Sequence, residues 1–225
     1  MNSIELMVEE HKYIMRMLAV VRIACNKILV GEKISYDDFD EMIEFITKYA
    51  DEHHHGKEEK FLFKEMVDHL GKMGTNLVTH GMLVEHDWGR LFIIELKAAL
   101  IRVKSGDDES RLDIIANAIG YTNHLTRHIA KEDAVVYTFA AKSLAPEILE
   151  RINKQTDSFE ENASKNGTQA HYMELLEKLE RKYLLTDIIL QELKFEKVIS
   201  VFDYPMEYQN INKTRSFDKY LEINC

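Results

Sequence analysis

Two short stretches of the chain carry the same pattern, 74 positions apart: His54-His55-Gly56-Lys57-Glu58-Glu59 and His128-Ile129-Ala130-Lys131-Glu132-Asp133. Each stretch pairs a histidine with a glutamate four residues later. On an α-helix, residues four apart lie on the same face, one turn from each other. Two such helices that face each other would bring two imidazoles and two carboxylates to one point.

The sequence around these motifs favours long helices. Four amphipathic stretches follow one another, at residues 2–30, 35–70, 76–104 and 108–143. Gly31, then Gly71 and Gly74, and then Gly106 separate them, and glycine commonly ends a helix. Because the connections are short, neighbouring helices should run antiparallel. The sequence therefore predicts an all-α fold, an up-down-up-down four-helix bundle, with additional C-terminal helices.

Two more helices are expected after the bundle, at 146–164, with Pro146 in the first turn, and at 168–199. The last residues show no clear period. We therefore expect a bundle over residues 1–145, a helical extension that packs on it over 146–199, and an irregular tail over 200–225.

Composition narrows the class of protein. The chain has 225 residues, 45% hydrophobic and 30% charged, with a net charge of −10. This charge argues against nucleic acid or an anionic membrane as the main partner. No apolar run reaches the ~20 residues that span a bilayer, and the N-terminus does not resemble a signal peptide. Two cysteines, Cys25 and Cys225, make no disulfide framework, which indicates a cytoplasmic protein.

The candidate ligands are the histidines and glutamates on the apolar faces. In the second and fourth helices these faces carry the His/Glu pairs, and the first and third helices each add one inward histidine. The predicted metal ligands are His11, His54, Glu58, His86, His128 and Glu132. His124, one turn before His128, is a further candidate.

The other histidines are expected in solvent: His53, His55, His69, His80 and His171. Glu59 and Asp133 each follow a motif glutamate and are expected at the surface or behind the ligands. Trp88 is expected to be a packing residue.

Burial of four imidazoles and two carboxylates without compensation would cost several kcal/mol per charged group. A bound cation makes the same arrangement favourable. Six ligands are too many for one tetrahedral zinc ion, and imidazole with carboxylate suits iron. We therefore predict two iron ions, bridged by carboxylates and by an oxo or hydroxo group, with manganese or zinc as substitutes.

The pattern resembles the hemerythrin-like family, which carries the HHE cation-binding domain. The strings that carry the resemblance lie within residues 1 to about 145; they are Glu10-His11, the two motifs quoted above, and Glu85-His86-Asp87 with Gly89-Arg90. The resemblance implies a non-haem di-iron centre inside an up-down bundle. Oxygen-carrying hemerythrins have a second histidine four residues after the one on the third helix, where this chain has Arg90. The resemblance is closer to bacterial members implied in iron sensing, nitric-oxide response or iron–sulfur cluster repair.

Three functions remain open from the sequence. The leading hypothesis is a di-iron protein that senses or handles O2, NO, peroxide or iron. No nucleophile or general base stands out apart from the metal ligands, which favours a sensor over an enzyme and leaves catalytic turnover open. The second is a ferritin-like di-iron oxidase, which would need Glu-x-x-His pairs on two helices; Glu52-x-x-His55 is the single instance. The third is a helical interaction module with a structural metal, whose C-terminal extension binds a protein partner.

Overall fold

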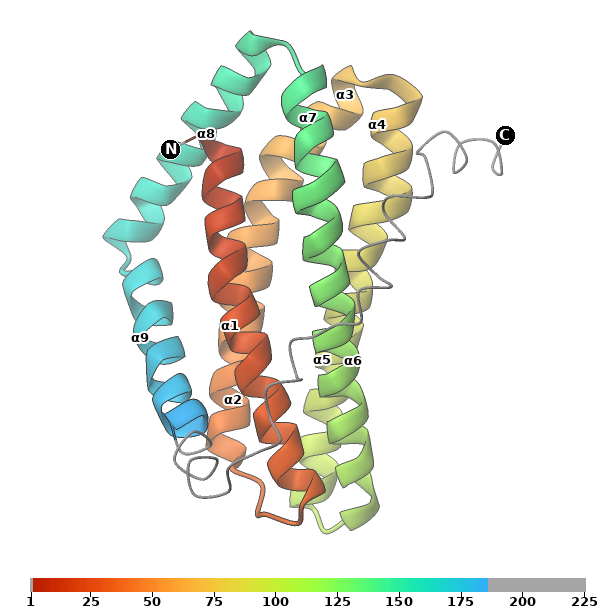
Figure 1. Cartoon of the computed structure of the whole chain (residues 1–225), viewed down its shortest axis with the longest axis vertical. Coiled ribbons are helices and arrows are strands. Elements are labelled where there is room, and N and C mark those ends of the chain that lie inside the picture. The colour runs from red at the N-terminus through yellow and green to blue at the C-terminus, as the bar shows by residue number, and fades with distance from the viewer. Residues whose placement is uncertain (1, 186–225) are drawn as a thin grey trace, which may run out of the picture. The chain divides into compact units, whose positions relative to one another are not determined.

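Four long helical segments run antiparallel, side by side, in the computed structural model, which describes residues 2–185 (Figure 1). The first segment is a single helix, α1 (Ser3–Leu29). Asn2 caps it: its side chain accepts a hydrogen bond from the Glu5 amide, and the Glu5 carboxylate accepts one from the Asn2 amide. Such a reciprocal pair satisfies two amide groups that the first turn leaves free.

The other three segments are helices of mixed geometry, in which α-helical and wider π-helical turns alternate. The second segment contains α2 (Tyr36–Glu44), η1 (Phe45–His55), η2 (Glu58–Phe63) and α3 (Lys64–His69). The third contains α4 (Gly71–Leu77), η3 (Val78–Met82) and α5 (Leu83–Lys104). The fourth contains η4 (Asp108–Ser110), a short 3-10 turn, α6 (Arg111–Lys131), η5 (Glu132–Val136) and α7 (Tyr137–Ser143). The predicted all-α bundle is confirmed, with helix ends close to the predicted ones.

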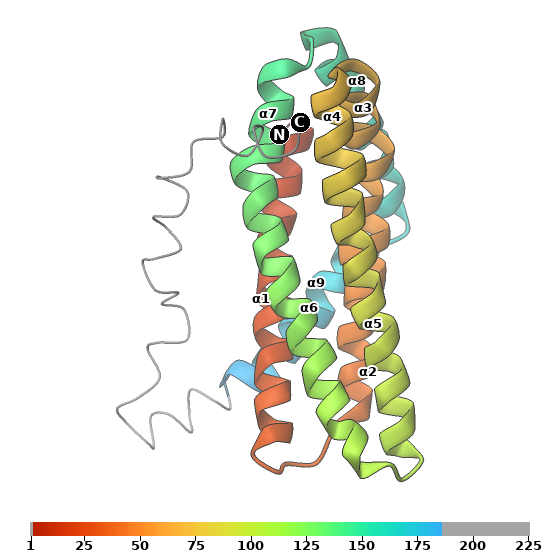
Figure 2. The same ribbon diagram turned by 90° about the vertical axis from the view of Figure 1, so that its right-hand side faces the viewer.

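A polar layer divides the core of the bundle into two apolar clusters. On α1, Met7 belongs to one cluster and Ile14 to the other, and His11 lies between them. The same order recurs along the third segment, where Met82 of η3 and Ile93 of α5 lie on either side of His86. The predicted ligands thus occupy one level of the bundle, between the two apolar clusters. Figure 2 shows the helices α1, α2, α5 and α6 of the bundle from a second side.

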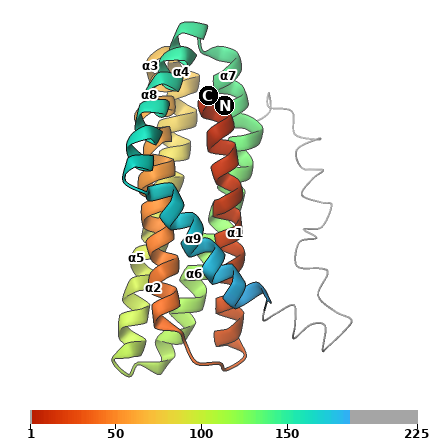
Figure 3. The same cartoon turned by 90° about the vertical axis from the view of Figure 1, so that its left-hand side faces the viewer.

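The chain continues after the bundle as α8 (Pro146–Lys165), α9 (Thr168–Glu180) and a final turn, η6 (Arg181–Leu185). Pro146 begins α8, as predicted. Figure 3 shows both helices on the face of the bundle formed by α1 and the second segment. The additional C-terminal helices are therefore confirmed as far as residue 185. The predicted domain boundaries stay a prediction. Residues 186–225 lie outside the part of the chain that the structure describes.

The extension shares the apolar core of the bundle. Leu176 and Leu179 of α9 are fully buried in one apolar cluster, and Ile152 of α8 is buried in the other. Ion pairs at the rim add to this contact: Arg151 binds the Glu65 carboxylate through two nitrogens, and Arg16 binds Glu180 in the same way. Burial of each leucine contributes about 1.5–3 kcal/mol, so α9 is held mainly by its apolar face.

Candidate metal centre

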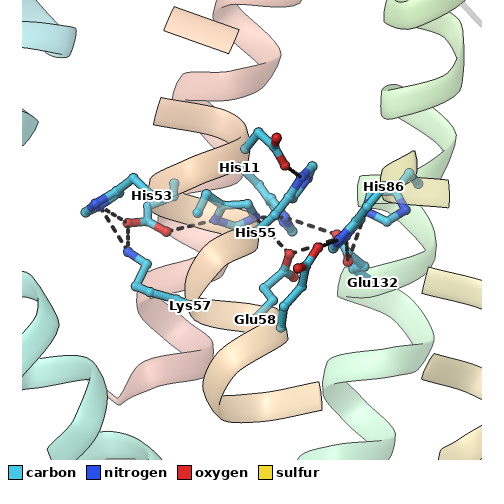
Figure 4. Close-up of polar contacts among 12 residues, drawn as sticks. His11, His53, His55, Lys57, Glu58, His86 and Glu132 are labelled. Atoms are coloured by element: carbon cyan, nitrogen blue, oxygen red, sulfur yellow. Dashed lines mark hydrogen bonds and ion pairs between the residues drawn. The ribbon is translucent and has the colours of Figure 1, made fainter. Parts of the chain in front are cut away.

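All six predicted ligands meet in the polar layer, and each is at most 2% exposed: His11, His54, Glu58, His86, His128 and Glu132. Their ring nitrogens and carboxylate oxygens gather in two adjacent groups, and Figure 4 shows His11, Glu58, His86 and Glu132 converging on one another. The structure thus brings together the residues that the sequence singled out.

One group of ligand atoms comes from α1, the second segment and the fourth segment. His11 Nε2 and His54 Nε2 are 2.9 Å apart. Glu132 Oε2 is 3.4 Å from His11 Nε2, and Glu58 Oε2 is 3.8 Å from His54 Nε2. These four residues form one compact set of possible metal ligands.

A second group lies beside the first. His86 Nε2 and His128 Nε2 are 3.1 Å apart, and His55 completes this set. Both carboxylates reach it as well, with Glu132 Oε1 3.1 Å from His128 Nε2 and Glu58 Oε2 3.6 Å from His86 Nε2. Glu58 and Glu132 therefore lie between two adjacent groups of imidazoles.

A carboxylate faces the outer nitrogen of each of the four predicted histidines. His11 Nδ1 is 2.8 Å from Asp133 Oδ1, and His54 Nδ1 is 2.8 Å from Glu10 Oε2. The other two contacts are His86 Nδ1 to Glu59 Oε1, 2.7 Å, and His128 Nδ1 to Glu85 Oε2, 2.9 Å. A proton on Nδ1 leaves the Nε2 lone pair of a neutral imidazole pointing to the centre, which is the form that binds metals.

The buried glutamates test whether a cation fits this site. Glu58 Oε2 and both oxygens of Glu132 lack a hydrogen-bond donor of good geometry, although they are fully buried. The remaining oxygen, Glu58 Oε1, accepts a hydrogen bond from the Tyr137 hydroxyl at 2.5 Å. Unpaired buried carboxylate oxygens are costly. A cation between the carboxylates and the facing ring nitrogens would remove this cost, so the residues fit a metal.

The pKa shifts of the buried groups also indicate that this layer needs additional positive charge. Burial, reinforced by the Glu132 carboxylate, raises the pKa of Glu58 well above its usual range. Burial opposes protonation of His128, but the carboxylates of Glu132 and Glu85 outweigh it and raise the pKa to about 10. Burial and the nearby His11 lower the pKa of His54 to about 4. Protons or metal ions can supply this positive charge, and the lowered pKa of His54 favours the neutral imidazole that binds metals.

His55 corrects the sequence analysis, which expected it in solvent. Its side chain is buried and stacks on His86, with ring centroids 3.8 Å apart. Its Nδ1 is 3.2 Å from Asp51 Oδ1, and Arg90 binds the same carboxylate at 2.7 Å. His55 is therefore built into the layer in the same way as the predicted ligands, as a seventh candidate.

His53 was also expected in solvent and is also buried. It lies outside the two ligand groups, beside Lys57, Glu10 and Glu160 (Figure 4). His69, His80 and His171 are exposed, as predicted. Trp88 was expected to pack and is instead 53% exposed.

His124 belongs to neither ligand group. Its Nε2 lies 2.7 Å from the backbone oxygen of Glu85, and its side chain is half-buried. It therefore donates to the backbone of Glu85, the same residue whose carboxylate contacts His128. Glu59 and Asp133 lie behind the ligands, one of the two places expected for them.

Helix geometry explains why three consecutive histidines are buried. The second segment is π-helical from Phe45 to His55 and again from Glu58 to Phe63, and the fourth from Glu132 to Val136. A π-helical turn is wider than an α-helical one, and such turns are common at functional sites. The 3.6-residue period used for the sequence analysis therefore assigns His55 to the wrong face. The outer acids Glu10 and Glu85 were missed too, although each directly precedes an inward histidine.

Comparison with known families agrees with this geometry. The family model of the hemerythrin HHE cation binding domain matches residues 2–140. The chain belongs to this family. The match ends before α8, so α8 and α9 lie beyond the part that the family model describes.

Two further comparisons add nothing to the family assignment: neither the curated proteins nor the solved structures gave a match. Among the described helices, none is long and apolar enough to cross a lipid bilayer.

Proposed function

We propose that this hemerythrin-family chain binds two iron ions and uses them to sense or handle O2, NO, peroxide or iron itself. The observation that carries the proposal is the arrangement of Glu58 and Glu132, two buried carboxylates with unpaired oxygens between two groups of imidazoles. His11 and His54 would hold one ion, and His55, His86 and His128 the other. Glu58 and Glu132, which lie between the two groups, would contribute carboxylate oxygens to both ions.

The chemistry that such a pair supplies when bound is reversible binding or reduction of a small molecule at an open metal position. The chain's own residues prepare the site for it. The outer acids orient the imidazoles, the apolar clusters exclude water, and the Tyr137 hydroxyl holds one oxygen of Glu58. Manganese or zinc would fit the same donors as substitutes.

The ferritin-like oxidase is the weaker alternative. Its Glu-x-x-His signature requires both residues to face the metals, but here Glu52 is exposed and pairs with Lys48 on the surface. The interaction module stays a proposal for the C-terminal region, since residues 186–225 lie outside the described part. A cytoplasmic location, which the sequence suggested from its cysteines, stays a proposal as well.

Anaerobic reconstitution with Fe(II), followed by addition of O2 or NO, tests this function. We expect each gas to change the absorption spectrum of the iron-loaded protein within the mixing time of a rapid-mixing experiment. The His54→Ala protein should bind less iron and show no such change. An iron-loaded wild-type protein whose spectrum responds to O2, NO and peroxide no faster than free Fe(II) would contradict the proposed gas chemistry.

A further inference from the structure

A buried charge network lies beside the metal centre, on the side that faces the C-terminal extension. Its centre is Lys57, whose side chain is fully buried. The Lys57 ammonium group contacts carboxylate oxygens of both Glu10 and Glu160 and lies 3.1 Å from His53 Nε2. Phe159 covers it, with the ammonium 5.7 Å from the ring centroid. A buried ammonium is costly unless carboxylates pair with it, so both acids are required here.

The two acids come from different parts of the chain. Glu10 belongs to α1, within the part that the family model matches, whereas Glu160 belongs to α8, beyond it. Gln169, in the first turn of α9, donates a hydrogen bond of 2.7 Å to Glu160 Oε2. The extension thus supplies one counter-charge for Lys57 and holds that counter-charge in place.

The network reaches a candidate metal ligand through Glu10. One oxygen of Glu10, Oε1, contacts Lys57, and the other, Oε2, contacts His54 Nδ1 at 2.8 Å. His54 Nε2 points into the centre, 2.9 Å from His11 Nε2. A continuous series of charged contacts therefore runs from Glu160 through Lys57 and Glu10 to His54.

The other outer acids are held differently. Glu85, behind His128, pairs with Lys131, which is 44% exposed. Glu59 and Asp51 share Arg90, which is 36% exposed and lies on the bundle itself. Among the three described cations that hold these outer acids, Lys57 alone is fully buried, and its second carboxylate comes from the extension.

We propose that Glu160 is a positioning residue for the metal centre: it fixes Lys57, and through Lys57 and Glu10 it sets the orientation of His54. The inference rests on the proposed metal-binding function and adds a role for the extension. With Glu160 in place, Lys57 is held from both sides, so Glu10 keeps one oxygen on Lys57 and the other on His54. Without it, Lys57 loses its outer anchor, and Glu10 no longer has a fixed position behind the imidazole.

The test compares Glu160→Gln with Glu161→Gln, its exposed neighbour on α8. Both variants lose one negative charge from the same helix. Iron affinity is measured anaerobically by competition with a chromophoric chelator, and the absorption spectrum of the loaded protein is recorded. Loss of a group that orients a metal ligand typically weakens metal binding 10–100-fold. We expect Glu160→Gln to bind iron about 10-fold more weakly, with a shifted spectrum, and Glu161→Gln to match the wild type.

A double-mutant cycle with Glu10→Gln separates positioning from general stability. If Glu160 acts through Glu10, adding Glu160→Gln to the Glu10→Gln protein should change iron affinity no further. An equal loss in both backgrounds would overturn the proposal. So would wild-type affinity and spectrum in Glu160→Gln, or equal losses in Glu160→Gln and Glu161→Gln.

Gln169→Ala is a less disruptive variant, to be used if Glu160→Gln does not fold. Circular dichroism of the protein before it is loaded with iron shows whether it folds. It leaves Glu160 charged but removes the hydrogen bond to its carboxylate and a longer one to its backbone oxygen. We expect a smaller loss of iron affinity in the same direction, and unchanged affinity in this folded variant would count against the proposal. Failure of the wild type to bind iron would contradict the proposed function itself and is thereby distinguished from these outcomes.

Discussion

In the metal centre, a carboxylate lies within hydrogen-bond distance of the outer nitrogen of each imidazole. For His55 this carboxylate is that of Asp51. Arg90 holds Asp51 and also Glu59, which faces His86. Since His55 and His86 stack on each other, one arginine supports both members of this pair. His55 therefore has the same surroundings as the predicted metal ligands.

Replacement of His55 tests this reading. We expect His55→Ala to weaken iron binding by at least 10-fold, because a ligand matters at least as much as the groups that orient it. His69→Ala, which removes an exposed imidazole further along the same segment, should leave iron affinity unchanged. Iron content and affinity measured on the two purified variants check this, and equal behaviour of the two would remove His55 from the ligand set.

Asp38 makes the stability of the fold depend on pH, independently of the metal centre. It is buried near the start of the second segment, where Tyr183 donates a hydrogen bond of 2.6 Å to it and Lys182 pairs with it. Burial opposes ionisation of Asp38, but Lys182 and Tyr183 outweigh it and lower the pKa of the carboxyl group. A lowered folded-state pKa means that this stabilisation is present above the unfolded pKa, near 4, and is lost as pH falls through the folded pKa.

We therefore expect Asp38→Asn to lower the free energy of unfolding at pH 7 by about 1–3 kcal/mol. The difference between the variant and the wild type should shrink as pH falls below about 4. Urea unfolding at a series of pH values measures this difference. A difference that stays constant down to pH 2 would show that the charge of Asp38 is not what stabilises the contact.

The turn between α3 and α4 brings the backbone at Gly74 close to Met66 and Leu70. A β-carbon on Gly74 would lie 2.2 Å from the backbone oxygen of Met66 and 2.9 Å from Leu70 Cβ. Backbone atoms cannot yield as a flexible side chain can, so α4 would have to move. At Gly81, in the same segment, the nearest atom would be 3.7 Å away.

We expect Gly74→Ala to destabilise the protein by about 1–3 kcal/mol, the usual cost of overpacking. Gly81→Ala should be neutral or slightly stabilising, because alanine favours helix more than glycine does. Thermal unfolding followed by circular dichroism compares the two variants. A Gly74→Ala protein as stable as Gly81→Ala would show that α3 and α4 do not approach this closely.

The helical elements were largely predictable because amphipathic periodicity and glycine positions mark them directly. The predicted helix at 2–30 corresponds to α1, and Pro146 begins α8 as expected. The six predicted ligands reach the same layer because each lies on a continuous apolar face. The face predicted for His55 is wrong because the helix there is π-helical and departs from the 3.6-residue period. The face predicted for His53 is wrong because α8, an element distant in sequence, covers it.

Across the described molecule, the extension belongs to both apolar clusters of the bundle, with Ile152 in one and Leu176 in the other. Leu176 of α9 is fully buried among residues of α1 and the second segment. We expect Leu176→Ala to lower the free energy of unfolding by about 2–5 kcal/mol, as for core leucines elsewhere. Leu112→Ala, at a position 67% exposed, should change it by less than about 0.5 kcal/mol.

Equilibrium unfolding in urea, followed by circular dichroism, measures both leucine variants. If Leu176→Ala were as stable as Leu112→Ala, α9 would not be part of the core. That result would also weaken the link from α8 to the metal centre, because Gln169 of α9 holds Glu160.

We propose that the polar layer holds two metal ions rather than one. The most direct test is the iron content per chain after anaerobic reconstitution with Fe(II) and removal of unbound metal, measured by mass spectrometry against protein concentration from amino-acid analysis. We expect two irons per chain, because two groups of imidazoles share the Glu58 and Glu132 carboxylates. One iron per chain, or none, would contradict it.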